Sequence, residues 1–370
     1  MSDVSTMISA LAAVYAARVV LFMTGFRRQR ARWRTAVFTP SVTIVVPARN
    51  EESTLERCIT SLMRVDYPSS LLTVVVVDDR STDTTAQVLQ RLSTQYAELR
   101  IVTRTDHDVE RNLRGKPGAL QQGIDASTGE IILMTDADCS VSPGWVRGMV
   151  QQFSDPEVAL VAGLTSIAGT SLFDRIQDVE WTYTQAMAAG GIGLGVPLGC
   201  FGNNLAVRRT AFQEVGGYRK ISFSVTEDLA LQQALHDAGW RVRHAFHEMT
   251  SVQSLPARTL REYITQRHRW VRGGTSLGLR AVVFVATSVT LWLALALSLW
   301  QAMWWWVTAL LLLRVVADGF LISMAVHAVG RYRVVPFIPL SMVVLMLTEL
   351  FLPFLVLKKK VTWKDQVFRP

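Results

Sequence analysis

The sequence has few cysteines and lacks the common glycine-rich motifs that bind phosphate. Its three cysteines, Cys58, Cys139 and Cys200, are far apart and show neither CxxC nor Cys/His spacing. This argues against a zinc site and against a disulfide framework, and it fits a reducing cytoplasmic setting. No GxGxxG follows the first predicted strand, and no GxxxxGK(S/T) occurs. Neither a dinucleotide site nor a P-loop is supported, so phosphates would have to be held by a metal ion and separate side chains.

Acidic residues are fewer than basic ones, 30 against 38, which gives a formal net charge of +8. Such an excess raises the question of a nucleic-acid partner. Five arginines, however, lie in one short run, RRQRARWR at residues 27–34, directly after an apolar stretch. Because the run adjoins a predicted membrane segment, anionic lipid head groups explain it better. We expect membrane lipids as partners and no nucleic acid.

Charged residues are scarcest near the two ends of the chain, where the apolar residues concentrate. Half of all residues are hydrophobic. Residues 7–26 are long enough for one membrane span, interrupted by Arg18, which predicts a tilted helix or one packed against neighbours. A cleaved signal peptide is the alternative, although MSDVST carries no Lys or Arg before the apolar run. The positive-inside rule places the arginine run on the cytoplasmic face.

Three further stretches of spanning length lie near the carboxyl end, at residues 281–300, 303–326 and 334–357. Three spans that start from a cytoplasmic domain would leave KKK (358–360) on the outer side of the membrane. The positive-inside rule instead predicts that those lysines lie on the cytoplasmic side. One segment is therefore expected to be re-entrant or to lie in the membrane interface, which leaves the topology open.

The predicted organisation has three parts. An amino-terminal anchor with its basic segment covers residues 1–36, a cytoplasmic domain covers 37–275, and about three membrane helices with a basic tail cover 276–370. The middle part is long enough for one sizeable core. The localisation that follows is a multi-pass protein of the cell (inner) membrane with a cytoplasmic domain.

The middle part reads as alternating strands and helices. VTIVVPARN (42–50), LTVVVVDDRSTDTT (72–85) and EIILMTDAD (130–138) are buried apolar runs that end in polar residues. Such a series folds into a mostly parallel sheet and predicts an α/β class. Ligands of open sheets bind beyond the carboxyl ends of the strands. That edge should gather Asn50 with Glu51, Asp78 with Asp79, and Asp136 with Asp138.

Asp136 and Asp138 are one residue apart, so their negative charges repel unless a cation lies between them. Hard divalent cations take oxygen ligands and often use one or two protein carboxylates. A tight turn with two solvated aspartates is the other interpretation. The position directly behind a buried strand favours the metal.

Five stretches in order resemble the processive and lipid-linked membrane branch of the family 2 glycosyltransferases, which have the GT-A fold. These are VVPARNE, VVVDDRSTD, GKPGALQQG, TDAD, and TED followed by QRHRW. The resemblance covers about residues 40–275 and the flanking membrane helices. It implies a GT-A domain with a mostly parallel sheet, flanked by transmembrane helices.

The resemblance assigns the donor side of the site. It implies that Asp79 reads the uracil ring of a nucleotide sugar and that the loop Pro47 to Asn50, with Glu51, lines the nucleoside. Lys116 in GKPGAL would offset the charge of the sugar diphosphate. A lone lysine in such a turn is ordinarily solvated, and two aspartates at a strand end often cap a helix.

The resemblance also assigns Asp136 and Asp138 to the DxD element that holds Mg²⁺ or Mn²⁺ against the diphosphate. It makes Asp228 the catalytic base of an inverting displacement. Glu227 beside it would serve the acceptor and diphosphate side. Acidic residues at a helix start are otherwise only favourable with the helix dipole, with Thr226 as a plausible cap.

Gln266, Arg269 and Trp270 fit the QxxRW pattern of that family, with a guanidinium suited to diphosphate oxygens and an indole face suited to a sugar. A basic helix in the membrane interface is the alternative reading of the same residues.

These features predict a membrane glycosyltransferase that moves a hexose, glucose from UDP-glucose in the first instance, to a lipid or carotenoid-like hydroxyl. A processive polysaccharide synthase is the runner-up, because such synthases also carry QxxRW. It would need enough spans to line a channel, and this chain offers a modest set. A non-catalytic membrane scaffold with the same fold is the third hypothesis.

Overall fold

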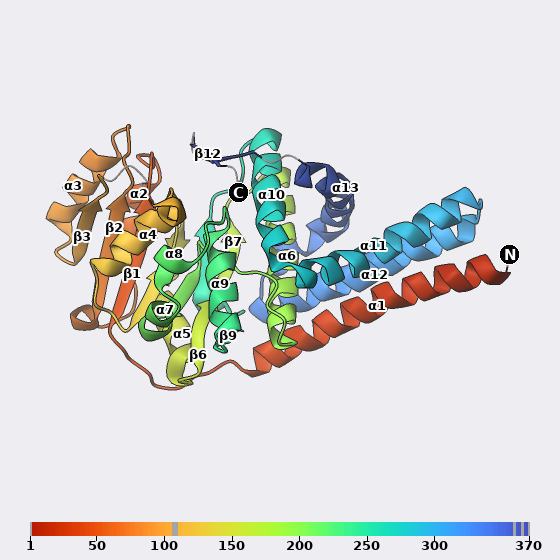
Figure 1. Ribbon diagram of the computed structural model, residues 1–370, viewed down its shortest axis with the longest axis horizontal. Helices are drawn as coiled ribbons and strands as arrows, with labels where there is room; N and C mark the ends of the chain where they lie inside the picture. The colour runs from red at the N-terminus through yellow and green to blue at the C-terminus, as the bar shows by residue number, and fades with distance from the viewer. Residues whose placement is uncertain (1, 106–109, 358–359, 364–365, 369–370) are drawn as a thin grey trace.

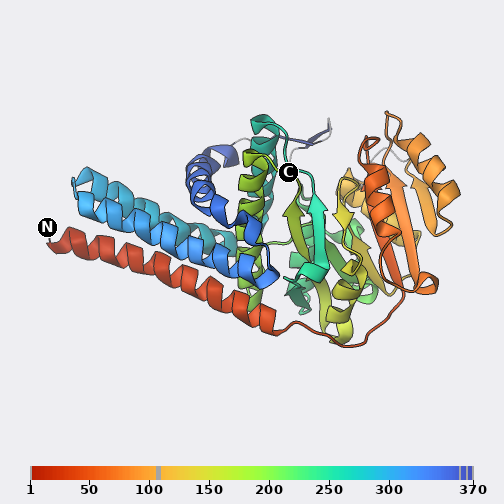
Figure 2. The ribbon, with the colours of Figure 1, turned by 180° about the vertical axis from the view of Figure 1, so that it is seen from behind.

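The computed structural model describes residues 2–105, 110–357, 360–363 and 366–368, so Lys358 and Lys359 of the predicted basic tail lie outside the described residues. The described part consists of an α/β domain joined to a bundle of long apolar helices, which projects from one side (Figure 1). Figure 2 shows the same two parts from behind.

A seven-stranded sheet forms the centre of the domain, in the order β3-β2-β1-β4-β8-β6-β9. Its first four strands are parallel. β8 is antiparallel to both its neighbours, and β6 and β9 are parallel to each other. The bounds are β1 Val42–Ala48, β2 Leu72–Asp78, β3 Leu99–Thr103, β4 Ile131–Met134, β6 Val158–Ala162, β8 Leu205–Arg208 and β9 Arg241–His244. The mostly parallel sheet predicted from the sequence is confirmed.

Side chains of the central strands alternate between two hydrophobic cores. Ile44 and Val46 of β1 face the core beneath α2 and α3, whereas Val45 between them faces the core beneath α4. Burial on both faces explains why the strands read as unbroken apolar runs. The helices on the domain are α2 Leu55–Leu62, α3 Thr85–Gln95, α4 Lys116–Asp125, α5 Trp145–Val150, α7 Arg209–Glu214, α8 Gly217–Lys220 and α9 Glu227–Asp237.

A second, three-stranded sheet and two longer helices complete the wall nearest the bundle. The sheet has the order β5-β10-β7, with bounds Ser140–Val141, Ser251–Ser254 and Leu164–Ile167. The helices α6 Leu172–Gly193 and α10 Leu260–Gly274 stand between the domain and the bundle (Figure 1). β11 Val361–Trp363 and β12 Gln366–Phe368 pair at the end of the chain.

Four helices among the described residues are long and apolar enough to cross a membrane: Asp3–Ala31, Leu279–Trp300, Trp304–Val329 and Tyr332–Phe351. They correspond to α1 Ser2–Ala31, α11 Leu279–Trp300, α12 Trp304–Val329 and α13 Ile338–Val356 with the turn before it. α1, α11 and α12 run alongside one another, whereas α13 is seen nearly end-on beside α10 in both views (Figures 1 and 2). These helices support the membrane association that the sequence predicts.

α1 is fixed to the domain by a close crossing with α6 at glycines. A Cβ added to Gly25 would lie 2.0 Å from the carbonyl oxygen of Gly190, and one added to Gly193 would lie 1.9 Å from that of Gly25. Small residues allow two helix backbones to approach this closely. The end of α1 and the end of α6 therefore pack as one unit.

Polar side chains meet inside the bundle rather than facing lipid. The Arg18 guanidinium is buried, and its carbon lies 4.7 Å from the Phe284 ring centroid. Nearby, Arg314 on α12 is 2.7 Å from Asp318 and 2.7 Å from Glu349 on α13. Ionisable groups at membrane depth face protein in this way because exposure to hydrocarbon is costly.

Candidate active site

A cleft of about 990 Å³ opens at the carboxyl ends of β1, β2 and β4 and extends to α10. It is lined by residues from every motif that the sequence singled out. The predicted site residues on its wall are Pro47, Glu51, Asp79, Lys116, Asp136, Asp138, Glu227, Asp228, Gln266, Arg269 and Trp270. The rule that ligands bind beyond the carboxyl ends of parallel strands thus gathers residues from distant parts of the chain.

Among the residues expected at this edge, Asp78 is buried and does not line the cleft, and Asn50 is exposed and does not line it either. The Asn50 φ of 53° is in the left-handed region, which asparagine adopts more readily than most residues. Its Oδ1 accepts a hydrogen bond of 2.8 Å from the Thr82 N–H, and its own N–H donates to Ser81 Oγ. Asn50 joins the loops after β1 and β2, and so supports the wall from behind.

Asp79 is 2% exposed at the end of β2 and lies among arginines. Its carboxylate is 2.9 Å from Arg80 and 3.4 Å from Arg104. Burial raises the pKa of Asp79, while the positive charges of Arg104 and Arg80 oppose that rise. The Asp79 N–H donates to the carbonyl oxygen of Ala48, which ties the first two strand ends together. The carboxylate is therefore held rigidly at the cleft.

Lys116 connects the two sides of the cleft. It follows Gly115, whose φ of 63° turns the chain into α4. Its Nζ lies 2.7 Å from Asp136 Oδ1 and 2.8 Å from Glu227 Oε1. Burial alone would lower the pKa of Lys116, but the charges of Asp136 and Glu227 outweigh burial and raise it. The ammonium therefore stays charged and neutralises two acids, one from the loop after β4 and one from the start of α9.

The two aspartates after β4 suit a divalent cation that shares its ligands with a phosphate. Asp136 and Asp138 both line the cleft and are only partly buried. They offer oxygen atoms alone, as Mg²⁺ and Mn²⁺ prefer. Within the described residues, no group of three or more His, Cys, Asp or Glu side chains could hold a metal by itself. The pair thus fits a cation that takes its remaining ligands from a substrate.

Asp228 begins the helix that faces this acidic pair. Its Oδ2 accepts a hydrogen bond of 2.6 Å from the Gly202 N–H, and its Oδ1 accepts one of 2.8 Å from the Leu229 N–H. Burial, followed by the neighbouring Glu227 charge, raises the pKa of Asp228 to about 6. A carboxylate tuned toward neutral pH and fixed by two backbone donors can accept a proton from a bound ligand.

The capping role that the sequence suggested for Thr226 is wrong. Thr226 is at the N-cap position of α9, but its side chain makes no capping hydrogen bond. Its hydroxyl lies 3.1 Å from Ser224 Oγ, and its N–H donates to that same oxygen. The first turn of α9 has its acidic residues, Glu227 and Asp228, in the cleft instead.

α10 presents its predicted residues and several others to the cleft. Gln266, Arg269 and Trp270 line it as expected, and so does His268. The Trp270 ring centroid is 5.0 Å from that of Trp181 and 5.9 Å from that of Phe201. Trp181 and Phe201 line the cleft too, and we call the three rings the aromatic wall. Trp181 was not predicted from the sequence, because it lies in an ordinary helical pattern, far from any motif.

Replacing Lys116 with methionine should destabilise the fold by about 3 kcal/mol, the cost of leaving buried acids without their cation. Thermal unfolding of the purified protein at pH 8 measures the loss. Lys220→Met, on the exposed surface of α8, is the matched control. Equal melting temperatures for both variants at pH 8 would contradict the assigned role.

Comparison with known proteins agrees with this geometry. The mannosyltransferase PcManGT from Pyrobaculum calidifontis, solved in complex with GDP-Man and Mn²⁺, has a similar fold, with a TM-score of 0.61 and 20% sequence identity. The match covers 94% of this chain and 99% of that one. At that identity the likeness shows the fold alone, which confirms the predicted GT-A class.

Sequence relatives are more similar over the domain. A beta-monoglucosyldiacylglycerol synthase of Nostoc sp. is 32% identical over 242 residues, 64% of this chain and 49% of that protein. A poly-beta-1,6-N-acetyl-D-glucosamine synthase of Staphylococcus aureus is 26% identical over 245 residues, 65% of this chain and 56% of that protein. The chain spans about half the length of the curated relatives it matches.

The model of one protein family covers nearly the whole sequence, including the apolar helices. That family is described as glycosyl transferase family 21, and the match extends over residues 4–369. The chain therefore belongs to glycosyl transferase family 21, which is of the family 2 type that its motifs predicted.

Proposed function

We propose that this protein is an inverting glycosyltransferase that moves glucose from UDP-glucose to the hydroxyl group of a membrane lipid. The observation that carries the proposal is the cleft itself. One space is lined by carboxylates suited to a divalent metal ion with its diphosphate, by a carboxylate whose pKa of about 6 suits a base, and by the aromatic wall beside the apolar helices. The glucosyldiacylglycerol synthases among its relatives support both the sugar and the lipid.

The donor side is the edge formed by β1, β2 and β4. Asp79 would accept hydrogen bonds from the uracil, since its carboxylate is fixed beside Arg104. Pro47 and Glu51 would line the nucleoside, and Asn50 would keep their loop in place. Lys116 would bind the diphosphate, because its ammonium lies beside Asp136, one of the two acids proposed to hold the metal. Mg²⁺ or Mn²⁺ held by Asp136 and Asp138 would neutralise charge on the departing diphosphate.

Asp228 is the base in this proposal. Its carboxylate takes the proton from the acceptor hydroxyl as the hydroxyl oxygen forms a bond to the anomeric carbon. The bond between that carbon and the diphosphate breaks in the same step, and UDP leaves with its electron pair. A single displacement inverts the configuration at the carbon, so an α-linked donor gives a β-glucoside. Gln266 and Arg269 lie where they can contact the sugar diphosphate.

The acceptor side is the aromatic wall and the helices next to it. Leu198, Leu229 and Leu255 line the cleft together with the three rings. Such a surface suits an apolar acceptor whose polar group is small, such as diacylglycerol or a carotenoid-like alcohol. Polymer synthesis remains the second candidate, because one relative is named as a polysaccharide synthase.

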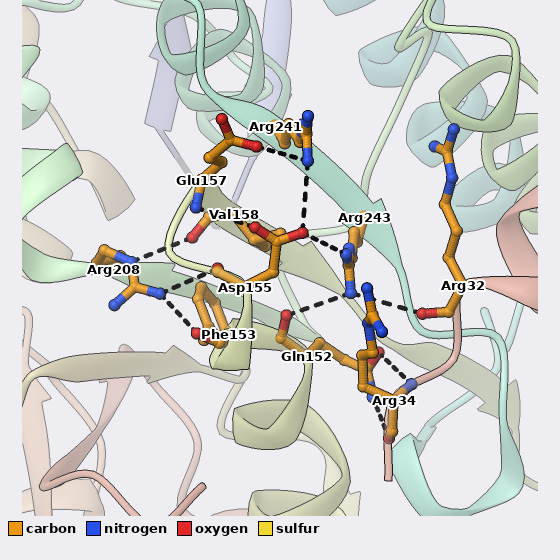
Figure 3. Close-up of polar contacts among 10 residues, drawn as sticks. All are labelled: Arg32, Arg34, Gln152, Phe153, Asp155, Glu157, Val158, Arg208, Arg241 and Arg243. Atoms are coloured by element: carbon orange, nitrogen blue, oxygen red, sulfur yellow. Dashed lines mark hydrogen bonds and ion pairs between the residues drawn. The ribbon is translucent and has the colours of Figure 1, made fainter. Parts of the chain in front are cut away.

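The domain would face the cytoplasm, anchored by the arginine run that covers the end of α1 and the residues just beyond it. Figure 3 shows how the end of this run is held. The Arg34 N–H donates to Gln152 Oε1, and the Arg32 carbonyl oxygen accepts from Arg243, which is 2.7 Å from Asp155. These contacts use the backbone of Arg32 and Arg34, whose side chains are exposed. Their guanidinium groups can therefore meet anionic head groups.

In the proposed topology, α1, α11 and α12 span the membrane, and α13 lies in its interface. α13 packs on α10 and α6 of the domain, and its axis departs from that of the bundle (Figures 1 and 2). Its exposed apolar residues follow helical spacing: Leu340, Val343, Leu347, Leu350 and Phe354. Lys360, just beyond α13, lines the cleft. The chain would thus end on the cytoplasmic side, as the positive-inside rule requires.

Purified protein in nanodiscs should transfer glucose from UDP-glucose to dioleoylglycerol. Extraction with organic solvent should recover a lipid product whose anomeric proton coupling is that of a β-glucoside. Chelation should abolish transfer, and Mg²⁺ or Mn²⁺ should restore it. Label in a large insoluble polymer would favour the polysaccharide synthase. No transfer from any of a panel of nucleotide sugars would favour a scaffold.

The rate should depend on pH through Asp228. Because the base acts deprotonated, kcat/KM should be level above its pKa of about 6. Below that value it should fall about tenfold per pH unit. Asp228→Asn should lower kcat by about 10²–10⁴-fold while UDP binding is unchanged. Asp237→Asn, at the other end of α9, is the control. Near-normal transfer by Asp228→Asn would refute the assignment.

Single cysteines labelled from outside intact spheroplasts test the topology. All three native cysteines are buried, which keeps background labelling low. An impermeant maleimide should label Thr6→Cys and Gln301→Cys, at the outer ends of α1 and α11. It should label Thr35→Cys and Lys360→Cys only after lysis. External labelling of Lys360→Cys would show that α13 spans the membrane.

A further inference from the structure

Behind the aromatic wall lies a buried polar cluster that none of the sequence motifs predicts. Glu180 on α6 is 2% exposed, and its carboxylate is 2.7 Å from the Arg267 guanidinium. The Tyr263 hydroxyl lies 2.7 Å and 2.8 Å from the two Glu180 oxygens. Arg267 and Tyr263 belong to α10 and are buried as well. The three side chains join the domain helix α6 to the helix that carries QRHRW.

The cluster contacts the aromatic wall from the side away from the cleft. The Arg267 guanidinium carbon is 4.4 Å from the Trp270 ring centroid and 4.7 Å from that of Tyr263. Glu180 immediately precedes Trp181, whose ring meets Trp270 edge to face. Trp181 and Trp270 line the cleft, whereas Glu180, Tyr263 and Arg267 do not. The polar cluster therefore contacts the Trp270 indole, which in turn meets that of Trp181, without reaching the ligand space.

We propose that the Glu180–Arg267 ion pair is a positioning element that sets the orientation of Trp270 and Trp181 and thereby the affinity for the acceptor. This inference rests on the proposed function for the identity of the acceptor. A planar guanidinium that is bound along one edge by a carboxylate can hold its flat face against a neighbouring aromatic ring. An ammonium has no such face. Glu180 supplies that hold, and Tyr263 fixes the carboxylate by donating to it.

The cluster also reaches the membrane side of the protein. The Tyr263 hydroxyl is 3.3 Å from the Thr348 hydroxyl on α13. Glu349, the next residue, pairs with Arg314 of α12. The aromatic wall is therefore connected through side chains to the helix that we place in the membrane interface. An acceptor that arrives from the bilayer would pass these helices and then contact the aromatic wall. The same helices set the orientation of that wall.

Steady-state kinetics with UDP-glucose and dioleoylglycerol test the proposal. Glu180→Gln keeps the volume but removes the charge, and Arg267→Lys keeps the charge but removes the plane. Each should raise the KM for dioleoylglycerol about tenfold, the size expected for one lost desolvated cation–π contact. The dissociation constant for UDP should change less than about twofold, since no donor group is touched. Glu56→Gln, which removes an exposed pair with Arg91, is the matched control.

A spectroscopic measurement keeps the proposal testable without the acceptor. Two indoles at 5.0 Å give an exciton couplet in far-ultraviolet circular dichroism, and Trp181→Phe identifies the couplet of this pair. Glu180→Gln should give the same difference spectrum when it is recorded at a temperature at which the variant is folded, because loss of the Arg267 counter-charge should lower its melting temperature. If Glu180→Gln does not fold, Arg267→Lys decides both readouts.

The outcomes separate this inference from the proposed function. Absence of transfer to dioleoylglycerol by the unchanged protein refutes the proposed acceptor, and the couplet then tests the positioning role alone. Transfer with an unchanged KM in both variants, or an unchanged couplet, overturns the inference. Equal losses of UDP and acceptor affinity also overturn it, because they indicate a general structural role.

Discussion

The cleft depends on a cation that neutralises acids brought together from distant parts of the chain. Lys116 contacts Asp136 after β4 and Glu227 at the start of α9. Without its charge, the sheet edge and α9 would repel each other where they must meet. The same arrangement explains how the site can accept a divalent ion. A carboxylate that is already paired with an ammonium can bind a metal ion in its place. If a diphosphate binds with the metal, the net charge of the site changes little.

Much of the fold could be predicted from the sequence because buried parallel strands have a distinctive composition. β1, β2 and β4 are runs of Val, Ile and Leu that end in polar residues, and their parallel order follows from the intervening helices. The antiparallel direction of β8 could not be predicted in this way. LAVR is four residues long, and its direction is set by pairing with β4 and β6 rather than by its own pattern.

Some residues of the candidate site could likewise be predicted from the sequence, and others could not. Aspartates at the strand ends were found because a rule links strand ends to ligands; Asp79, Asp136 and Asp138 lie on the cleft, whereas Asp78 does not. Asn50 was expected there as well, but its side chain satisfies the backbone of the next loop. Trp181 and Glu180 were not predicted, because each occupies an ordinary position in the sequence. Their importance comes from contacts with α10, which forms far along the chain and can be located only in three dimensions.

The glycine crossing between α1 and α6 bears on where the cleft lies relative to a membrane. With Gly25 against Gly190, no larger side chain fits between the two helices, and the end of α1 is held close against the domain. In the membrane enzyme that we propose, this joint would keep the mouth of the cleft at a set height above the bilayer. A lipid hydroxyl near that height would reach the cleft by lateral diffusion, whereas one raised on a bulky head group would not.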